Sequence, residues 1–228
     1  YKRYLSANSI ETLTDEEQNW LEQHGAVRIG YLKNDVGVSL VDEKSEEPTG
    51  IINDYISLAS DCLEEKNIEF QTKGFDSQEE ELQALKDNRI DMIFHMNQNP
   101  YEAEQNDIIL SNTVFEVNVA VLTGVEKFDE NGKNTVAVSR NNLLGKWYIS
   151  FNYPFWKIKE YDSSAEVEKA VHSGEADCFV VKAGQSLKTL ANSKMHSVFL
   201  TKPGDSCFAV TRENITLMNI LNKTIQTL

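Results

Sequence analysis

The sequence predicts an α/β protein built from two similar lobes, because one unit of strand, helix and strand occurs twice. Phe75-Asp76-Ser77 in the first copy matches Tyr161-Asp162-Ser163 in the second, 86 positions later. In each copy a Glu follows the Ser three positions later, the capping-box pattern in which both side chains satisfy free N–H groups at a helix start. A short amphipathic helix and an apolar strand come next. Two such lobes imply a cleft, and two crossings between them form a hinge.

The turn before the last strand of each copy ends in an Asp, Asp91 or Asp177, eleven residues past the capping Glu. Its identical place in both copies predicts a structural role, holding the loop before each strand, rather than a catalytic pair. The strands that follow, Met92-Ile93-Phe94 and Cys178-Phe179-Val180-Val181, are runs typical of strands buried on both faces of a parallel sheet.

The other elements follow from local start signals and apolar spacing. Thr14-Asp15-Glu16-Glu17 is a third capping box, which opens a helix that ends at Gly25. The remaining expectations, in chain order, are a strand at 27–32, a hairpin near 38–41, a helix at 51–63, a strand from 68, a polar loop at 97–100, an extended passage at 108–122, a strand at 136–138, a helix from about 141, a strand at 208–210 and a helix at 217–225.

The extended passage is the expected first crossing between the lobes, and the last helix is expected to return to the first lobe. We therefore expect a linker at 1–13, lobe 1 at 14–113 with 203–228, and lobe 2 at 114–202. The aromatic residues between Trp147 and Trp156 are expected to pack in the core or an interface of lobe 2, with a ring stack in the cleft as the alternative.

Composition excludes several classes of function. The 228 residues include 36 acidic and 22 basic ones, a net charge of −14 that would repel nucleic acid and anionic membrane surfaces. No stretch is apolar enough to span a bilayer. Cys62, Cys178 and Cys207 lack metal-ligand spacing, so we expect no metal and no cofactor, and a Cys178–Cys207 bridge stays open. No catalytic triad, phosphate loop or HExxH motif occurs, so we expect no enzyme.

Five motifs stand in a set order along the chain. They are Leu13-Thr14-Asp15-Glu16-Glu17-Gln18-Asn19-Trp20-Leu21, Val27-Arg28-Ile29-Gly30, Gly50-Ile51-Ile52-Asn53-Asp54-Tyr55, Ile90-Asp91-Met92-Ile93 and Gly174-Glu175-Ala176-Asp177. In this order they resemble the family 3 bacterial extracellular solute-binding proteins, over residues 13–228. Within that family they are most similar to the sensor domains that precede the membrane segment of histidine kinases and diguanylate cyclases.

The resemblance implies a two-lobed periplasmic-binding-protein type II fold, the Venus flytrap, that closes around a small polar solute. It also implies an extracellular or periplasmic place on a membrane-anchored parent protein, with a tandem domain or a homodimer partner. The expected function is a sensor that signals by hinge closure. One alternative is the solute-binding subunit of an ABC importer. Another alternative is an enzyme on this scaffold, but the expected cleft has no evident acid/base pair.

The family's amino-acid binders hold the ligand carboxylate with an Arg after the fourth strand and the ammonium with an Asp in the second lobe. In this chain Glu102 falls near the place of that Arg, and Lys182 near the place of that Asp. The resemblance therefore implies a small polar ligand other than a standard α-amino acid.

Polar and mostly neutral side chains remain around the expected cleft. Arg140, near a helix start, would receive an anionic group, since free N–H groups and the helix dipole favour negative charge there. An alternative is that the Asn residues only form turns and helix caps, and that the lobe contacts a partner domain instead of a ligand. For Asp54 the alternative is that it only stabilises the first turn of a helix. The candidate ligand-binding residues are Asp35, Asp54, Asn97, Gln98, Asn99, Ser139, Arg140, Asn141 and Lys182.

Overall fold

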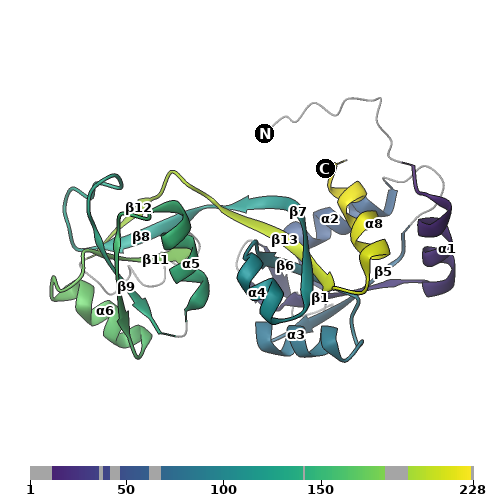
Figure 1. The fold of residues 1–228 in the computed structure, drawn as a ribbon, viewed down its shortest axis with the longest axis horizontal. Helices are drawn as coiled ribbons and strands as arrows, with labels where there is room; N and C mark the ends of the chain where they lie inside the picture. Colours follow the sequence, from purple (N-terminus) through teal and green to yellow (C-terminus); the bar gives the residue numbers. More distant parts are fainter. Residues whose placement is uncertain are drawn as a thin grey trace. The chain divides into compact units, whose positions relative to one another are not determined.

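The computed structural model describes residues 12–35, 38–41, 47–61, 68–140, 142–182 and 195–226. The chain divides into two compact units (Figure 1), of which unit 1 comprises Tyr1–Phe115 with Ser206–Leu228 and unit 2 comprises Glu116–Asp205. The chain therefore passes from one unit to the other twice, after Phe115 and after Asp205. The sequence placed these two crossings after residues 113 and 202.

Unit 1 is built on a five-stranded sheet with the order β5-β1-β6-β13-β7. In this sheet β1 pairs in parallel with β5 and β6, while β13 is antiparallel to β6. A second, small sheet contains β2, β3 and β4. The elements of unit 1 are α1 (Asp15–His24), β1 (Val27–Leu32), β2 (Asn34–Asp35), β3 (Ser39–Val41), β4 (Pro48–Thr49), α2 (Ile51–Asp61), β5 (Phe70–Phe75), α3 (Gln78–Lys86), β6 (Met92–Asn97), α4 (Pro100–Gln105), β7 (Ile108–Val117), β13 (Gly204–Thr211) and α8 (Ile215–Gln226).

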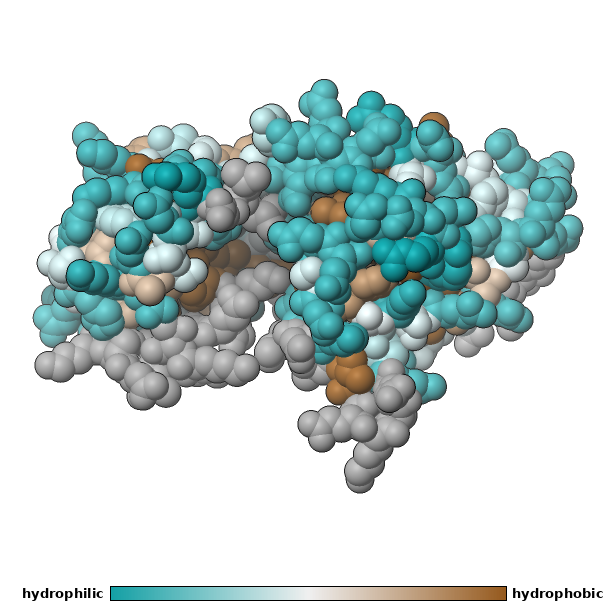
Figure 2. Space-filling model, turned by 90° about the horizontal axis from the view of Figure 1, so that it is seen from below, coloured by the Kyte–Doolittle hydropathy of each residue, from teal (hydrophilic) through white to brown (hydrophobic). Residues whose placement is uncertain are grey.

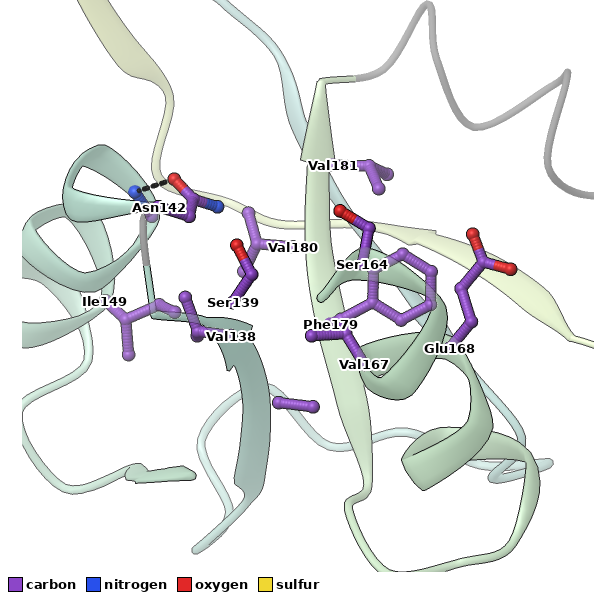
Figure 3. Close-up of a pocket in the computed structure, with 12 residues that line it drawn as sticks. Val138, Ser139, Asn142, Ile149, Ser164, Val167, Glu168, Phe179, Val180 and Val181 are labelled. Carbon is purple, nitrogen blue, oxygen red and sulfur yellow. Dashed lines mark hydrogen bonds between the residues drawn. The ribbon is translucent and has the colours of Figure 1, made fainter. Parts of the chain in front are cut away.

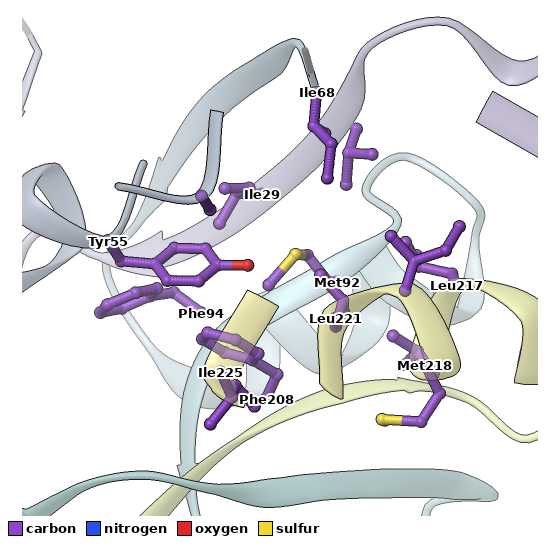
Figure 4. Packing of buried hydrophobic residues seen from close by; sticks show 14 of the residues in the cluster. Ile29, Tyr55, Ile68, Met92, Phe94, Phe208, Leu217, Met218, Leu221 and Ile225 are labelled. Carbon is purple, nitrogen blue, oxygen red and sulfur yellow. The ribbon is translucent and has the colours of Figure 1, made fainter. Parts of the chain in front are cut away.

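The two faces of this sheet are covered by different helices. Side chains of α1, α2 and α8 pack on one face, and those of α3 and α4 pack on the other. On the first face the ring of Tyr55 lies against Phe94 and Phe208 (Figure 4), with ring centroids 5.9 and 4.7 Å apart. Its hydroxyl shares a buried 3.0 Å hydrogen bond with Thr224 of α8, so this polar group stays satisfied inside an apolar layer.

Unit 2 repeats the plan with the strand order β10-β9-β11-β8-β12. Here β9 pairs in parallel with β10 and β11, and β8 is antiparallel to β11 and β12. Helix α5 packs on one face and α6 on the other. The elements are β8 (Val119–Thr123), β9 (Thr135–Ser139), α5 (Leu143–Asn152), β10 (Lys157–Tyr161), α6 (Ser164–His172), β11 (Cys178–Lys182) and β12 (His196–Phe199).

The repeat predicted from the sequence is confirmed in three dimensions. Segment β5-α3-β6 of unit 1 corresponds to β10-α6-β11 of unit 2, and in each unit the earlier strand, β1 or β9, lies between the two. Both helices start in the same way, because Ser77 accepts a hydrogen bond from the Glu80 N–H at 3.2 Å and Ser163 accepts one from the Glu166 N–H at 3.3 Å. The two copies therefore specify the same local fold.

The structural role predicted for the two turn aspartates is also confirmed. The Asp91 carboxylate accepts the Arg28 N–H at 2.8 Å, and the Asp177 carboxylate accepts the Thr135 N–H at 2.6 Å. Each Asp also donates its own N–H to the carbonyl of that same residue, at 2.8 Å in both cases. In both units the Asp thus joins the start of the last strand of the copy to the start of the central strand.

Several elements differ from the sequence expectation. The polar loop predicted at 97–100 is shorter, because Asn97 ends β6 and Pro100 begins a short helix, α4, that was not predicted. Strand β12 was not predicted either. Of the aromatic cluster in unit 2, Tyr148, Tyr153 and Trp156 are buried in the core, whereas Phe151 and Phe155 are exposed. Cys178 and Cys207 are buried and form no disulfide with each other. Cys62 and residues 1–11 of the expected linker lie outside the described residues.

The described surface is mainly hydrophilic on the face that Figure 2 shows. Within the part of the chain that the structure describes, no helix is both long and apolar enough to cross a membrane.

Candidate functional site

A pocket of about 390 Å³ lies in unit 2, at the carboxyl ends of β9 and β11 (Figure 3). These two strands are parallel neighbours, but the helices that follow β9 and β10 pack on opposite faces of the sheet. A crevice opens at such a point of an open α/β sheet, and ligands of this fold class bind there. The topology of unit 2 thus places a cavity beyond its strand ends.

The pocket has an apolar wall and a polar rim. The wall is formed by Ala137, Val138, Ile149, Val167, Phe179, Val180 and Val181. The polar side chains are Ser139 at the end of β9, Asn142 before α5, and Ser164 and Glu168 on α6. This volume and this mixture of many apolar groups with a few polar ones are typical of small-molecule sites.

Asn142 fixes one edge of the pocket by capping α5. Its side-chain oxygen accepts the Gly145 N–H at 2.8 Å, which leaves its amide NH₂ on the other side (Figure 3). A Cβ at position 145 would lie 2.5 Å from that amide nitrogen, so the cap requires a glycine there. The sequence predicted the helix start near Asn141, which lies outside the described residues.

Arg140, the predicted receiver of an anion, is engaged by carboxylates of its own unit. Its guanidinium lies 2.9 Å from Asp162 and 3.9 Å from Glu160, and its side chain is 65% exposed. Glu160 is also 3.0 Å from the ammonium of Lys146. The register of β9 and β10 explains this arrangement. Ser139 pairs with Tyr161 on the parallel strand β10, so the next residues, Arg140 and Asp162, lie side by side.

In unit 1 the corresponding strands are β1 and β6, and His95 within β6 pairs with Asp35, which follows the end of β1. Asp35 of β2 is 2.8 Å from His95 Nε2, and both side chains are almost fully buried, with 10% and 6% of their surface exposed. The His95 ring also lies 5.3 Å from the ring of Phe115. The sequence singled out Asp35 but not His95, since a single His within an apolar strand carries no signal of a buried partner.

Glu81 is a second buried carboxyl group of unit 1 that the sequence did not single out. The residue is 1% exposed, and neither carboxyl oxygen has a hydrogen-bond partner among the described residues. Its Oε1 would be 3.6 Å from a Cβ at Gly30, an ordinary van der Waals contact, so the carboxyl group lies directly beside β1. Desolvation, and to a smaller extent the charge of Asp35, raises the pKa of Glu81 to about 8.

The other candidates of unit 1 serve local structure or face the surface. Asn99 is buried and caps α4 by accepting the Tyr101 and Glu102 N–H groups, at 3.1 and 3.3 Å. Gln98 accepts a 3.3 Å hydrogen bond from Thr113 of β7, and half-buried Asn97 ends β6. Asp54 is exposed in the first turn of α2.

The structure gathers only part of the predicted set in one place. Ser139 lines the unit 2 pocket together with Asn142, and also with Ser164 and Glu168, two residues that the sequence did not single out. Lys182 ends β11, and its side chain is not among those described. Among the described residues, no three His, Cys, Asp or Glu side chains come together in a way that could hold a metal ion.

Comparison with known proteins adds the fold. No protein-family model and no curated protein matches the sequence. Among solved structures, the chain is similar to the periplasmic VFT2 domain of BvgS from Bordetella pertussis, with a TM-score of 0.67 and 22% identity, over 95% of this chain and 93% of that one. It also matches a structure of the BvgS periplasmic domain with a TM-score of 0.65 and 22% identity, over 95% of this chain but 43% of that one.

A further similar structure is the ancestral amino acid-binding protein AncCDT-1, a precursor of cyclohexadienyl dehydratase. The TM-score is 0.57 and the identity 18%, over 93% of this chain and 92% of that one. These likenesses confirm the fold class predicted from the sequence, the two-lobed Venus-flytrap fold of type II periplasmic binding proteins.

Proposed function

We propose that this chain is an extracellular small-solute-binding sensor domain of a membrane-bound bacterial signalling protein. The observation that carries the proposal is the pocket of about 390 Å³ between the carboxyl ends of β9 and β11, on a fold shared with the periplasmic VFT2 domain of BvgS. Since the chain spans 43% of the longer BvgS periplasmic domain, a tandem domain in the parent protein is part of the proposal.

The signal in this proposal is a change in the arrangement of the two units when a solute binds. Two strands, β7 and β13, carry the chain from one unit to the other, which is where a hinge would act. A ligand shifts such an equilibrium only by its difference in affinity for the two arrangements. Helix α8 is joined to α1 by the Lys223 ammonium, 2.6 Å from Glu17, so movement of unit 1 would reach the end of the described chain as a rigid piece.

The test is a thermal melt of the purified domain against a panel of amines, amino acids, nucleosides, short peptides and organic acids. At a hundred times its dissociation constant, a ligand that binds only the native state adds about 2.7 kcal/mol, which raises Tm by roughly 5–10 °C for a domain of this size. No rise with any member of the panel contradicts the proposal.

A matched pair of variants identifies the site of any hit. Ser164→Trp places a large ring at the rim of the pocket, whereas Ala165→Trp places it at the next exposed position of α6, which does not line the pocket. If the Tm rise is lost in Ser164→Trp but kept in Ala165→Trp, the ligand binds in this pocket. The same rise in both variants places the ligand elsewhere.

The alternative is the solute-binding subunit of an ABC importer, which the likeness to an amino acid-binding protein favours. We propose no catalytic role, because Glu168 is the one titratable side chain among the described residues that line the pocket, and an acid/base pair needs two. A turnover assay with the ligand found in the melt tests this, since chemical change of that ligand would contradict it.

A further inference from the structure

Glu168 is a carboxylate in the pocket wall for which the described residues supply no hydrogen-bond or ion-pair partner. It lies one turn after Ser164 on α6, so both side chains are on the face that lines the pocket (Figure 3). The residue is half-buried, and no hydrogen bond or ion pair joins it to any residue that the structure describes. A ligand that brings a cation to this wall would meet an unpaired charge.

The cations near the start of α5 are already paired with carboxylates. Arg140 lies against Asp162 and Glu160, and Lys146 against Glu160. Neither lines the pocket, and among the twelve described residues that do, Glu168 is the only one that carries a charge. The described residues of the pocket wall therefore carry a net negative charge, on a chain whose total is −14. An anionic ligand would be repelled without a compensating side chain.

The helix starts at the rim act in the opposite sense, but they are weaker. Each helix N-terminus carries about half a positive charge. In α6 the Ser163 hydroxyl accepts the Glu166 N–H of the first turn at 3.3 Å, and the Glu166 carboxylate itself places a negative charge in that turn. In α5, Asn142 satisfies the Gly145 N–H. A full unpaired charge in the wall thus outweighs two partial charges that are already capped.

The other side chains of the pocket wall indicate what kind of ligand body would fit. Ile149, Val167 and Phe179 come from three different elements and present apolar surface to the same cavity. Ser139 and Ser164 supply hydroxyl groups at its rim. Such a pocket favours an apolar body that ends in one polar head group.

We propose that the unit 2 pocket binds a small primary amine with an apolar body and no carboxylate, whose ammonium pairs with Glu168. The inference rests on the proposed function and narrows its ligand class. It also departs from α-amino-acid recognition, which needs a cationic group for the ligand carboxylate.

The test compares three probes of the same shape by isothermal titration calorimetry at pH 7: phenethylamine, phenethyl alcohol and hydrocinnamate. The expected order of affinity is amine, alcohol, carboxylate. Isoamylamine and isocaproate repeat the comparison with an aliphatic body. Equal or tighter binding of either carboxylate overturns the amine class but leaves the solute-binding function intact.

A charge-removing variant tests the residue itself. Glu168→Gln keeps the shape of the side chain and is expected to weaken phenethylamine binding about tenfold, the value of one partly exposed charge-assisted hydrogen bond, with phenethyl alcohol unaffected. Glu126→Gln, which removes a charge from an exposed residue of unit 2 outside the pocket, is expected to change neither. Unchanged amine affinity in Glu168→Gln overturns the assignment, and so does the absence of amine binding when other members of the wider panel raise Tm.

Discussion

Glu81 should make the stability of unit 1 fall as pH rises from about 5 to 8. Burial raises its pKa from the ordinary 4.5 to about 8, so between these values the folded chain holds a proton that the unfolded chain has released. Stability then falls with rising pH over this window and is constant above it. At 1.36 kcal/mol per pKa unit, the whole effect is about 5 kcal/mol.

The variant Glu81→Gln removes this titration while keeping the shape of the side chain. Its buried amide still lacks a partner and costs about 1–3 kcal/mol, but at every pH alike. We therefore expect the variant to gain on the wild type by about 5 kcal/mol between pH 5 and pH 9, and to be the more stable protein at pH 9. Urea unfolding at four pH values measures this difference.

Glu79→Gln is the matched control, because Glu79 is an exposed residue of the same helix. Its pH profile should run parallel to that of the wild type. Amide hydrogen exchange in β1 and β6 should assign the Glu81 effect to unit 1. Parallel profiles for Glu81→Gln and the wild type would refute the reasoning, since they would mean that the Glu81 carboxyl group is ionised in the folded state at neutral pH.

Three further predictions concern the framework of the two units. Asp91→Asn should cost about 1.5–3 kcal/mol at pH 7 by urea unfolding, because it removes the carboxylate that pairs with the Arg28 guanidinium, which then keeps, among the described residues, only its hydrogen bonds to Asn88. Burial alone would raise the pKa of Asp91, but hydrogen bonds from Arg28 and His24 hold this pKa below its usual value. The stability advantage of the wild type over Asp91→Asn should therefore disappear as pH falls through that pKa. An advantage that stays constant down to about pH 2 would contradict this. Gly30→Ala should cost about 1–3 kcal/mol, since its Cβ would lie 2.4 Å from Ile90 Cδ1, and an unchanged urea midpoint would rule that clash out. Ser77→Ala and Ser163→Ala should each lower stability by about 1 kcal/mol in thermal melts, and clearly unequal losses would show that the two caps are not equivalent.

Most of the fold could be predicted because its signals are local. The capping Ser and Glu, the turn Asp and the apolar strand all lie within one short segment, and the second copy provides an independent reading of the same pattern. Helix α4 was missed because it is six residues long and buries only Ala103, so it shows no periodicity. Pro100 directly after Asn99 was the available signal, since Pro is favoured in the first turn and Asn at the cap.

The pocket residues were less predictable because they come from elements that meet only when the helices of unit 2 pack on opposite faces of its sheet. Ser139 could be singled out since it directly follows a strand, and strand ends of a parallel sheet meet at one edge. Ser164 and Glu168 reach the pocket only because α6 packs on the face opposite to α5, which the sequence of α6 does not reveal. Arg140 was expected to be available for an anion, but the register of β9 with β10 brings Asp162 to it.

The two units differ in the carboxylate that lies near their central strands, because the one in unit 1 is paired and the one in unit 2 has no partner among the described residues. In unit 1, Asp35 and His95 Nε2 already pair in an almost dry environment, so a ligand would have to break that pair before it gained a new one. In unit 2, Glu168 of α6 has no such partner among the described residues and faces a cavity, so a cationic head group gains an interaction without losing another. Charge selectivity should therefore depend on unit 2, and Glu168→Gln should change which probes bind while Asp35→Asn changes mainly the stability of unit 1.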